Sequence, residues 1–386
     1  MGSHLFVVNS DTFPIHTQRG FAGVVKGGGR GYYAQLADLM NIRKGDLAFF
    51  YLMYIEKKRL LYSENKFEPG YYGIYKITSF PFVDENDIEG KDQFNSQYIF
   101  GNINSKHYQK AKEQEKWPVI LPIRILIEPM NNLNYAKHID DTTAYVDKTD
   151  EGQLWTLLFK KINKKGQARG ITPLLPEEAN KIARLLFKAN QIQFSDGVNL
   201  LEDIKFYDYP YKPKEFLDIK LEHNSNDLDS VRIENMLVAW IMKNIDKNVP
   251  VICDIVGIKE ELEFHGNHIQ YGISGDTIDI LLLHHRKING VEYRYKATVI
   301  EVKKDRINED NVKQVLKYTK WIAQLVTFNN ISSIQPVIIG KYPNNIQTIK
   351  IKEKIKNLNE KGIRTPIFIK YKLINEREFS FEKFEV

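Results

Sequence analysis

Cysteine is almost absent from this chain of 386 residues, which contains only Cys253. A single cysteine excludes an intramolecular disulfide framework and a zinc site ligated by several cysteines, and it fits a reducing, cytoplasmic environment. Because its neighbours are apolar, we expect Cys253 to be a small core residue of a strand. No apolar run approaches the ~20 residues of a membrane-spanning helix, and no signal peptide is visible. We therefore expect a globular protein that does not bind membranes.

Neither sign of charge dominates the sequence. The 55 Lys and Arg residues against 49 Asp and Glu residues give a formal net charge of +6, which permits nucleic-acid binding without demonstrating it. The 21 Tyr and 21 Phe residues, many near Lys and Arg in the first half, supply what base stacking requires. A proteome rich in Lys, Ile and Asn gives the same composition, so this observation has little weight. The length predicts two or three domains.

Two aliphatic segments of the second half each contain charged side chains. Asp279 lies within 278–282, and Glu301 and Lys303 lie within 299–303. The turn signal at 287–290 predicts that the segments are paired strands, so Asp279 can lie close to Glu301. Alternation along a strand puts Glu301 and Lys303 on one face. Charged groups are costly in buried strands unless they bind something, and Mg²⁺ needs only one or two carboxylates.

This pattern predicts nuclease chemistry. Asp279 and Glu301 would hold Mg²⁺, for which Mn²⁺ can substitute, and the carbonyl of Val302 could complete the protein ligands. Lys303 would orient or deprotonate the attacking water while the metal polarises the phosphate. Asp276 competes with Asp279, but we prefer Asp279 because it lies inside the apolar run. The alternative is a surface hairpin with ordinary salt-bridge charges.

Two predicted helices accompany these strands. Asn308 is a plausible helix cap, followed by Gln314 and Tyr318 on one helix face. A second amphipathic helix is expected over 231–243, with Glu234 near its start. The ordered combination resembles the PD-(D/E)xK nuclease superfamily, and the RecB-like branch in particular, over residues 226–340, although no Pro precedes the Asp. The resemblance implies these roles: Asp279, Glu301 and Lys303 catalytic, Glu234 an accessory metal or water ligand, Gln314 and Tyr318 supporting the site or contacting DNA.

The remaining segments of the second half extend this core. We expect a strand over 335–339, a helix over 346–361 and a strand over 365–372. His265 and His268 fall in a predicted hairpin, and the pair at 284–285 ends the Asp279 strand. A histidine metal site is one reading of these residues, but we favour neutral surface histidines.

The first half is predicted to be a small barrel with short helices. Apolar and aromatic strands are expected over 5–9, 47–51, 71–77 and 121–127. The glycine run at 27–31 leads into a helix that reaches Met40. Its spacing does not match a phosphate-binding P-loop, but it could let backbone amides approach a base or phosphate.

Several segments of this half resemble the EVE domain, a PUA-like barrel related to YTH readers. They are residues 33–35, 44–51, 73–77, 121–124 and 170–174, the last leading into a helix over 176–188. The triple glycine departs from the pattern. The resemblance implies a reader that accepts a flipped, modified base in an aromatic pocket. The candidate pocket residues are Ser10, Arg30, Tyr32, Tyr54 and Trp155.

Taken together, the sequence predicts two domains of α/β and β-barrel class. Residues 1–190 form a PUA-like small β-barrel with helices, 191–227 a linker, and 228–386 an α/β nuclease core with a mixed sheet. We expect a modification-dependent DNA endonuclease that reads a modified base, modified cytosine in particular, and restricts foreign DNA. Its partner would be modified double-stranded DNA, on which it acts as a homodimer. The alternatives are a structure-specific repair or RNA-processing nuclease, and a non-catalytic nucleic-acid-binding protein.

Overall fold

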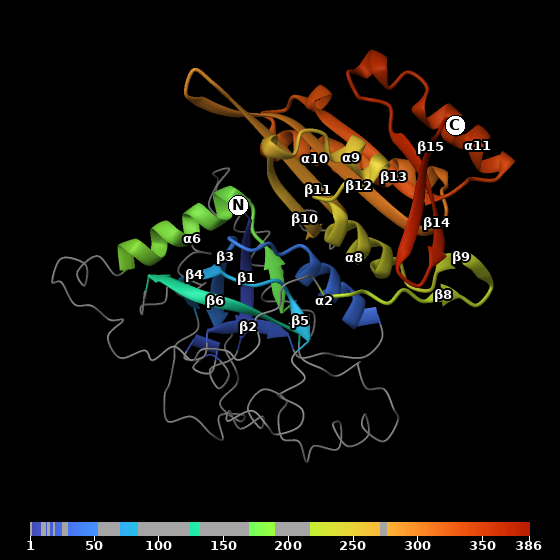
Figure 1. Cartoon of the computed structure of the whole chain (residues 1–386). Coiled ribbons are helices and arrows are strands. Elements are labelled where there is room, and N and C mark those ends of the chain that lie inside the picture. Colours follow the sequence, from blue (N-terminus) through green and yellow to red (C-terminus); the bar gives the residue numbers. More distant parts are fainter. Residues whose placement is uncertain are drawn as a thin grey trace, which may run out of the picture. The chain divides into compact units, whose positions relative to one another are not determined.

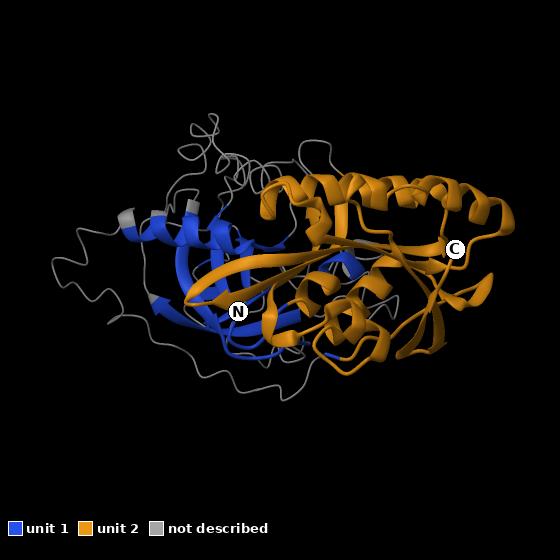
Figure 2. Ribbon diagram, turned by 90° about the horizontal axis from the view of Figure 1, so that it is seen from above, with its two compact units in different colours: residues 1–35, 42–217 blue, residues 36–41, 218–386 orange. Residues whose placement is uncertain are grey.

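The structure, a computed structural model, describes residues 2–8, 13, 16–17, 20–24, 30–52, 70–83, 123–131, 170–189, 217–270 and 276–386. The chain forms two compact units. The first comprises residues 1–35 and 42–217, and the second comprises 36–41 and 218–386 (Figure 2). None of the helices in the described residues is long and apolar enough to span a membrane.

The first unit is built on one curled sheet (Figure 1). Its strands, in spatial order, are β2 (Phe21–Val24), β6 (Ile123–Asn131), β4 (Gly70–Ile77), β3 (Leu47–Leu52), β1 (Ser3–Val8) and β7 (Ile171–Pro173), and β5 (Phe82–Val83) pairs with β6. Strand β6 pairs with β2 through its first residues and with β4 through its last, so the sheet bends along this strand into a half-barrel. Strands β1 and β3 are parallel.

The core of this unit lies between the sheet and helix α6 (Pro176–Ala189). Leu5 of β1 and Phe49 of β3 pack with Ile182 and Leu186 of the helix. The strands predicted in the first half are confirmed as β1, β3, β4 and β6, and the predicted helix is confirmed as α6. Helix α2 (Arg30–Met40) begins within the glycine run, at Arg30, and reaches Met40 as predicted.

The second unit contains a mixed sheet of six strands (Figure 1). In spatial order these are β10 (Leu262–Gln270), β11 (Thr277–Ile288), β12 (Val291–Arg306), β13 (Ile334–Lys341), β14 (Ile367–Asn375) and β15 (Glu378–Phe384). The helices are α8 (Glu234–Asn244), α9 (Pro250–Val256), α10 (Glu309–Val326) and α11 (Asn345–Ile355), with short 3-10 turns η3 (Lys259–Glu261), η4 (Ile331–Ser333) and η5 (Asn359–Lys361). A small hairpin, β8 (His223–Asn224) and β9 (Asp227–Val231), precedes α8.

The topology explains why the central strands are apolar on both faces. Strands β12, β13 and β14 are parallel and are joined by the crossover helices α10 and α11. Helices lie on both sides of the sheet (Figure 2), and residues 299–302 of β12 are all buried. A carboxylate in such a strand therefore has no solvent on either face.

Two local signals of the sequence are confirmed. Asn308 caps α10, accepting hydrogen bonds from the amides of Asp310 and Asn311 in a capping box. The turn between β11 and β12 is formed by Asn289 and Gly290, both with positive φ, as this turn type requires.

Three local predictions are wrong. Cys253 lies in helix α9, not in a strand, because Pro250 occupies the first turn and starts a helix there. The helix expected from 231 begins at Glu234, since Val231 is the last residue of β9. His284, expected at the surface, is fully buried and its Nε2 lies 2.6 Å from the carbonyl oxygen of Val256.

The ends of other elements also differ from the expected ones. The helix predicted over 346–361 ends at Ile355 and is followed by the separate turn η5. The hairpin β8–β9 occupies residues at which we expected the end of a linker. Strand β15 was not predicted, because its residues alternate with Glu and Lys and resemble an exposed tail.

Candidate active site

Strands β11 and β12 separate at the position of Asp279. Their pairing runs from Ile288 and Val291 to Ile280 and Ile300, so Glu301 is the next residue opposite Asp279. There the carboxylate of Asp279 accepts a hydrogen bond of 2.7 Å from the backbone N–H of Val302. Only 8% of Asp279 is exposed. The Asp279 carboxylate thus accepts the hydrogen bond that a backbone carbonyl of β11 would accept if the pairing of β11 and β12 continued.

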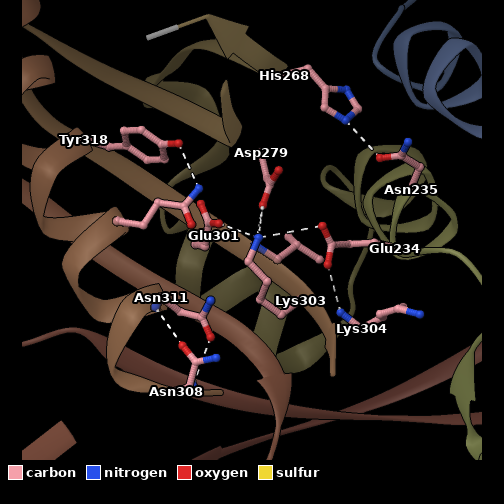
Figure 3. Close-up of polar contacts among 12 residues, drawn as sticks. Glu234, Asn235, His268, Asp279, Glu301, Lys303, Lys304, Asn308, Asn311 and Tyr318 are labelled. Carbon is pink, nitrogen blue, oxygen red and sulfur yellow. Dashed lines mark hydrogen bonds and ion pairs between the residues drawn. The ribbon is translucent and has the colours of Figure 1, made fainter. Parts of the chain in front are cut away.

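Glu301 is the most deeply placed charge of the site, with no exposed surface. Lys303 Nζ lies 2.5 Å from Glu301 Oε1 and 3.7 Å from Oδ2 of Asp279 (Figure 3). Despite this ion pair, neither oxygen of Glu301 has a partner with hydrogen-bond geometry among the described residues. Because Lys303 is shared with Asp279, it compensates the buried carboxylate of Glu301 only in part, and a further cation or a proton would stabilise it.

A bulge in β12 directs Lys303 into the site. The pairing of β12 with β13 shifts between Val302 and Arg306, so 303–305 face a single residue, Gly340. A Cβ added at Gly340 would lie 2.8 Å from Cγ1 of Ile307 and 3.1 Å from the carbonyl oxygen of Asp305. Glycine is therefore required for β13 to approach the bulge.

Both backbone groups of Lys304, in the middle of the bulge, have partners. Its N–H donates to Oε2 of Glu234 at 3.1 Å, and its carbonyl accepts from the hydroxyl of Tyr371 at 2.6 Å. The other oxygen of Glu234 lies 3.7 Å from Lys303 Nζ (Figure 3). Glu234 is the first residue of α8, so this helix connects its N-terminus to the bulge and the site.

The electrostatics of this group are unbalanced. Asp279, Glu301 and Glu234 surround one cation, Lys303, so the net charge is −2 when all four are ionised. Burial raises the pKa of Glu301, the charge of Asp279 raises it further, and Lys303 opposes both. Burial likewise raises the pKa of Asp279 against the effect of Lys303. Burial alone would lower the pKa of Lys303, but the three carboxylates outweigh it and the pKa is raised.

Gln314 and Tyr318 are on α10 and bond to each other, with Nε2 of Gln314 donating to the Tyr318 hydroxyl at 2.9 Å (Figure 3). Tyr318 is fully buried, and burial raises its pKa to about 12. A fully buried side chain cannot touch DNA in this conformation, which favours the supporting role over the DNA contact. Asp276 is outside the group, because its half-exposed carboxylate pairs with Lys317 at 2.8 Å.

The structure brings together the four residues expected to act, Asp279, Glu301, Lys303 and Glu234, with the amide of Val302. The structure does not describe the side chains of the proposed base pocket. Arg30 and Tyr32 lie in the first turn of α2, where only the backbone is described. Ser10, Tyr54 and Trp155 lie outside the described residues.

Two residues of the site were missed in the sequence. Gly340 lies near the end of the apolar strand β13, and an isolated glycine in a strand is a known sign of close backbone approach. Tyr371 lies in an alternating strand, and nothing in its local sequence distinguishes it from a core aromatic.

The residues present fit a divalent cation held by few protein ligands. The described residues contain no group of three or more His, Cys, Asp or Glu side chains arranged to hold a metal ion. Mg²⁺ does not require one, since it takes one or two carboxylates and keeps water and phosphate as its other ligands. Glu301 offers two buried oxygens without hydrogen-bond partners, and a charge of +2 would balance the group. Asp279 and Glu301 would hold the ion.

Comparisons with known proteins give similarity in structure alone. No protein-family model matches the chain, and no curated protein matches it. The human THYN1 protein, solved in complex with DNA containing 5-methylcytosine, is 18% identical with a TM-score of 0.30, over 48% of this chain and 98% of that chain. A protein of Pseudomonas syringae is 21% identical with a TM-score of 0.30, over 48% of this chain and 99% of that one. A hypothetical protein of Leishmania major is 13% identical with a TM-score of 0.30, over 49% and 96%.

Proposed function

We propose that the chain is a metal-dependent DNA endonuclease whose C-terminal unit hydrolyses phosphodiester bonds and whose N-terminal unit reads a modified base. The observation that supports the nuclease most is the arrangement of Asp279, Glu301 and Glu234 around Lys303, with Glu301 fully buried and without hydrogen bonds. A surface hairpin with ordinary salt bridges would not bury a carboxylate in this way.

Mg²⁺ held by Asp279 and Glu301 would polarise the scissile phosphate and lower the pKa of an attacking water. Lys303 is cationic in the metal-free site, because its pKa is raised by the surrounding carboxylates. It therefore suits orienting the water and stabilising negative charge on the phosphate better than removing a proton. Glu234 keeps Lys303 charged and fixes the bulge through the amide of Lys304.

Gln314 and Tyr318 support the site from α10. The Tyr318 hydroxyl stays neutral over the physiological pH range, since its pKa is raised to about 12 by burial. Its hydrogen bond from Gln314 fixes the position of both side chains. These residues exclude water from the sheet side of the site and do not take part in proton transfer.

The reader function is supported by the resemblance of the N-terminal segments to EVE domains and by the curled sheet on which they lie. We extend to this chain the 5-methylcytosine DNA of the human THYN1 complex as the ligand to test first. One buried methyl group contributes only about 0.8 kcal/mol, so discrimination needs polar contacts that fail with an unmodified base. Phosphate contacts by Lys and Arg would supply most of the affinity.

Joining a reader to a nuclease has a physical advantage. Tethering raises the local concentration of DNA at a weakly binding catalytic unit to roughly the millimolar range. The described residues of each chain contain one such group, so a double-strand break made by this group requires two copies on the DNA or two successive cuts. We therefore propose a dimer on DNA and a role in restricting foreign modified DNA.

The test is cleavage of a panel of substrates by the full chain with Mg²⁺ or Mn²⁺. The panel contains methylated, hydroxymethylated and plain duplexes, beside flaps, mismatches and structured RNA. Preferential cutting of a modified duplex is the expected result. Preference for branched DNA or RNA would replace the modified-DNA proposal with a structure-specific nuclease. Binding of DNA without cutting under any of these conditions would show a non-catalytic binding protein.

A further inference from the structure

His268 occupies the position beside the two carboxylates on the edge strand of the sheet. Asn267 of β10 pairs with Ile280 of β11, and Ile269 pairs with Ile278, so His268 is the residue opposite Asp279. Asp279 in turn is opposite Glu301 of β12. Three neighbouring strands thus contribute His268, Asp279 and Glu301 to one row across the sheet.

The backbone at His268 has a conformation that residues other than glycine rarely adopt. Its φ is +50°, in the middle of a strand whose neighbours on both sides remain paired with β11. Such a conformation costs on the order of 1–3 kcal/mol and persists only where other contacts hold it. The strand continues through this residue, and the His268 ring points away from Asp279 toward helix α8 (Figure 3).

The ring contacts in this orientation are specific. Nδ1 lies 2.9 Å from the amide nitrogen of Asn267, and Nε2 lies 3.0 Å from the side-chain oxygen of Asn235 (Figure 3). The Asn267 nitrogen also donates to Asp38 of the same compact unit, which identifies it as the amide nitrogen. Nδ1 also lies 3.9 Å from Oδ1 of Asp38. Since an amide nitrogen only donates, we assign Nδ1 of the neutral ring as the acceptor and Nε2 as the donor to Asn235.

The contact with Asn235 matters because α8 lacks a cap of its own. Its N-cap residue is Ile233, whose side chain forms no capping hydrogen bond. Helix α10, in contrast, closes its N-terminus with the capping box of Asn308. Asn235 directly follows Glu234, the residue that reaches Lys303 and the Lys304 amide. The hydrogen bond from His268 therefore fixes the uncapped turn that presents Glu234.

We infer that His268 is a positioning residue of the active site, which holds the first turn of α8 through Asn235 and thereby places Glu234 against Lys303. This inference rests on the proposed nuclease function for its catalytic consequence, but the hydrogen bond and the strained backbone do not depend on it. The left-handed conformation is retained because it aims the imidazole at Asn235.

A pair of substitutions separates the hydrogen bond from the backbone conformation. In His268→Gln the amide nitrogen can reach the position of Nε2 and donate to Asn235, whereas in His268→Asn the shorter amide only reaches the position of Nδ1. Asn tolerates a positive φ better than Gln does. We expect His268→Gln to keep kcat near the wild-type value and His268→Asn to lower it about tenfold or more, with little change in KM or Tm. Asn235→Ala should give the same loss, and combining it with His268→Asn should add nothing further.

A second measurement does not depend on cleavage. Hydrogen exchange of the backbone amides in the first turn of α8 should be faster in His268→Asn and Asn235→Ala than in the wild type and His268→Gln. Equal exchange and equal kcat in the Asn and Gln variants would overturn the inference. A wild-type protein that neither cuts DNA nor binds Mn²⁺ would instead overturn the nuclease proposal, and the exchange experiment would still decide the role of His268.

Discussion

Lys303 and Glu301, two residues apart on β12, form an ion pair of 2.5 Å in which the carboxylate is fully buried and the ammonium group is shared with Asp279 and Glu234. One cation cannot neutralise three carboxylates, so the metal-free site is electrostatically strained. Sites that bind charged ligands are commonly built at the expense of folding stability. This relationship leads directly to the first prediction.

Glu301→Gln should stabilise the metal-free protein and abolish cutting. The substitution keeps the shape of the side chain and removes a carboxyl whose ionisation is opposed by burial and by Asp279, leaving Lys303 with Asp279 and Glu234. We expect a gain of about 1 kcal/mol in the free energy of unfolding and no detectable cleavage. Urea unfolding in EDTA and a cleavage assay with Mg²⁺ measure the two effects.

The matched control for this variant is Glu382→Gln, an exposed carboxylate of β15 that pairs with Lys370. It should change stability by less than about 0.5 kcal/mol, as surface substitutions usually do, and leave cutting intact. If Glu301→Gln cuts DNA at the wild-type rate, Glu301 does not take part in catalysis.

Metal binding should release protons and strengthen as the pH rises. The pKa of Glu301 is raised, first by burial and then by Asp279, so the metal-free carboxyl keeps its proton at a pH where an exposed Glu has lost it. A divalent cation binds the ionised form, hence its apparent affinity should rise with pH, by up to about tenfold per unit while one proton is displaced. Calorimetric titration with Mn²⁺ at about pH 6 and about pH 8, in buffers of different ionisation enthalpy, measures this.

The same titration has an internal control in Glu301→Gln, which lacks the carboxyl of Glu301 and keeps that of Asp279. This variant should bind Mn²⁺ more weakly and release fewer protons. Wild-type binding that is independent of pH would show that Glu301 is not a ligand.

Gly340→Ala should damage both stability and catalysis. The added Cβ would lie 2.8 Å from Ile307 Cγ1 and 3.1 Å from the Asp305 carbonyl, so the bulge that aims Lys303 must move. We expect a loss of about 1–3 kcal/mol, as for other overpacked positions, and a loss of cutting larger than the stability change explains. Gly290→Ala is the control: Gly290 has φ of +85° and no atom near its Cβ position, so stability alone should fall. Equal cutting by both variants would separate the bulge from catalysis.

The parts of the fold that local chemistry determines could be predicted from the sequence. Asn308 predicted the start of α10, and Asn289 with Gly290 predicted the β11–β12 turn. Helix caps and tight turns are determined by residues within a few positions of one another. The sequence also predicted that Asp279 and Glu301 lie close together, because the turn determines the register of the two strands. The strand predicted at Cys253 was wrong because its apolar neighbours are typical of a strand, whereas Pro250 in the first turn starts a helix.

The features that could not be predicted from the sequence depend on residues that are distant from each other along the chain. The bulge at 303–305 exists because Gly340, in the next strand, admits it. The left-handed backbone of His268 is held by the side chain of Asn235, 33 residues earlier. The only local signal of the bulge is the isolated glycine at 340, and no local signal marks the backbone of His268. Burial decides the role of Tyr318 only once α10 is packed.

The buried imidazole of His284 should make folding stability depend on pH between about 4 and 6.5. Burial, with Lys296 nearby, lowers the pKa of His284 from 6.5 to about 4 in the folded protein. As the pH falls the unfolded chain binds the proton first, so this contribution to stability is complete above 6.5 and is lost progressively down to about 4. The loss amounts to at most about 3 kcal/mol. Urea unfolding across this range should show a smaller decrease for His284→Gln, which can still donate to the Val256 carbonyl but cannot gain a proton. Parallel decreases in the two proteins would assign the effect to other groups, and a wild-type stability that stays constant from pH 7 to about 5 would mean that His284 titrates normally in the folded state.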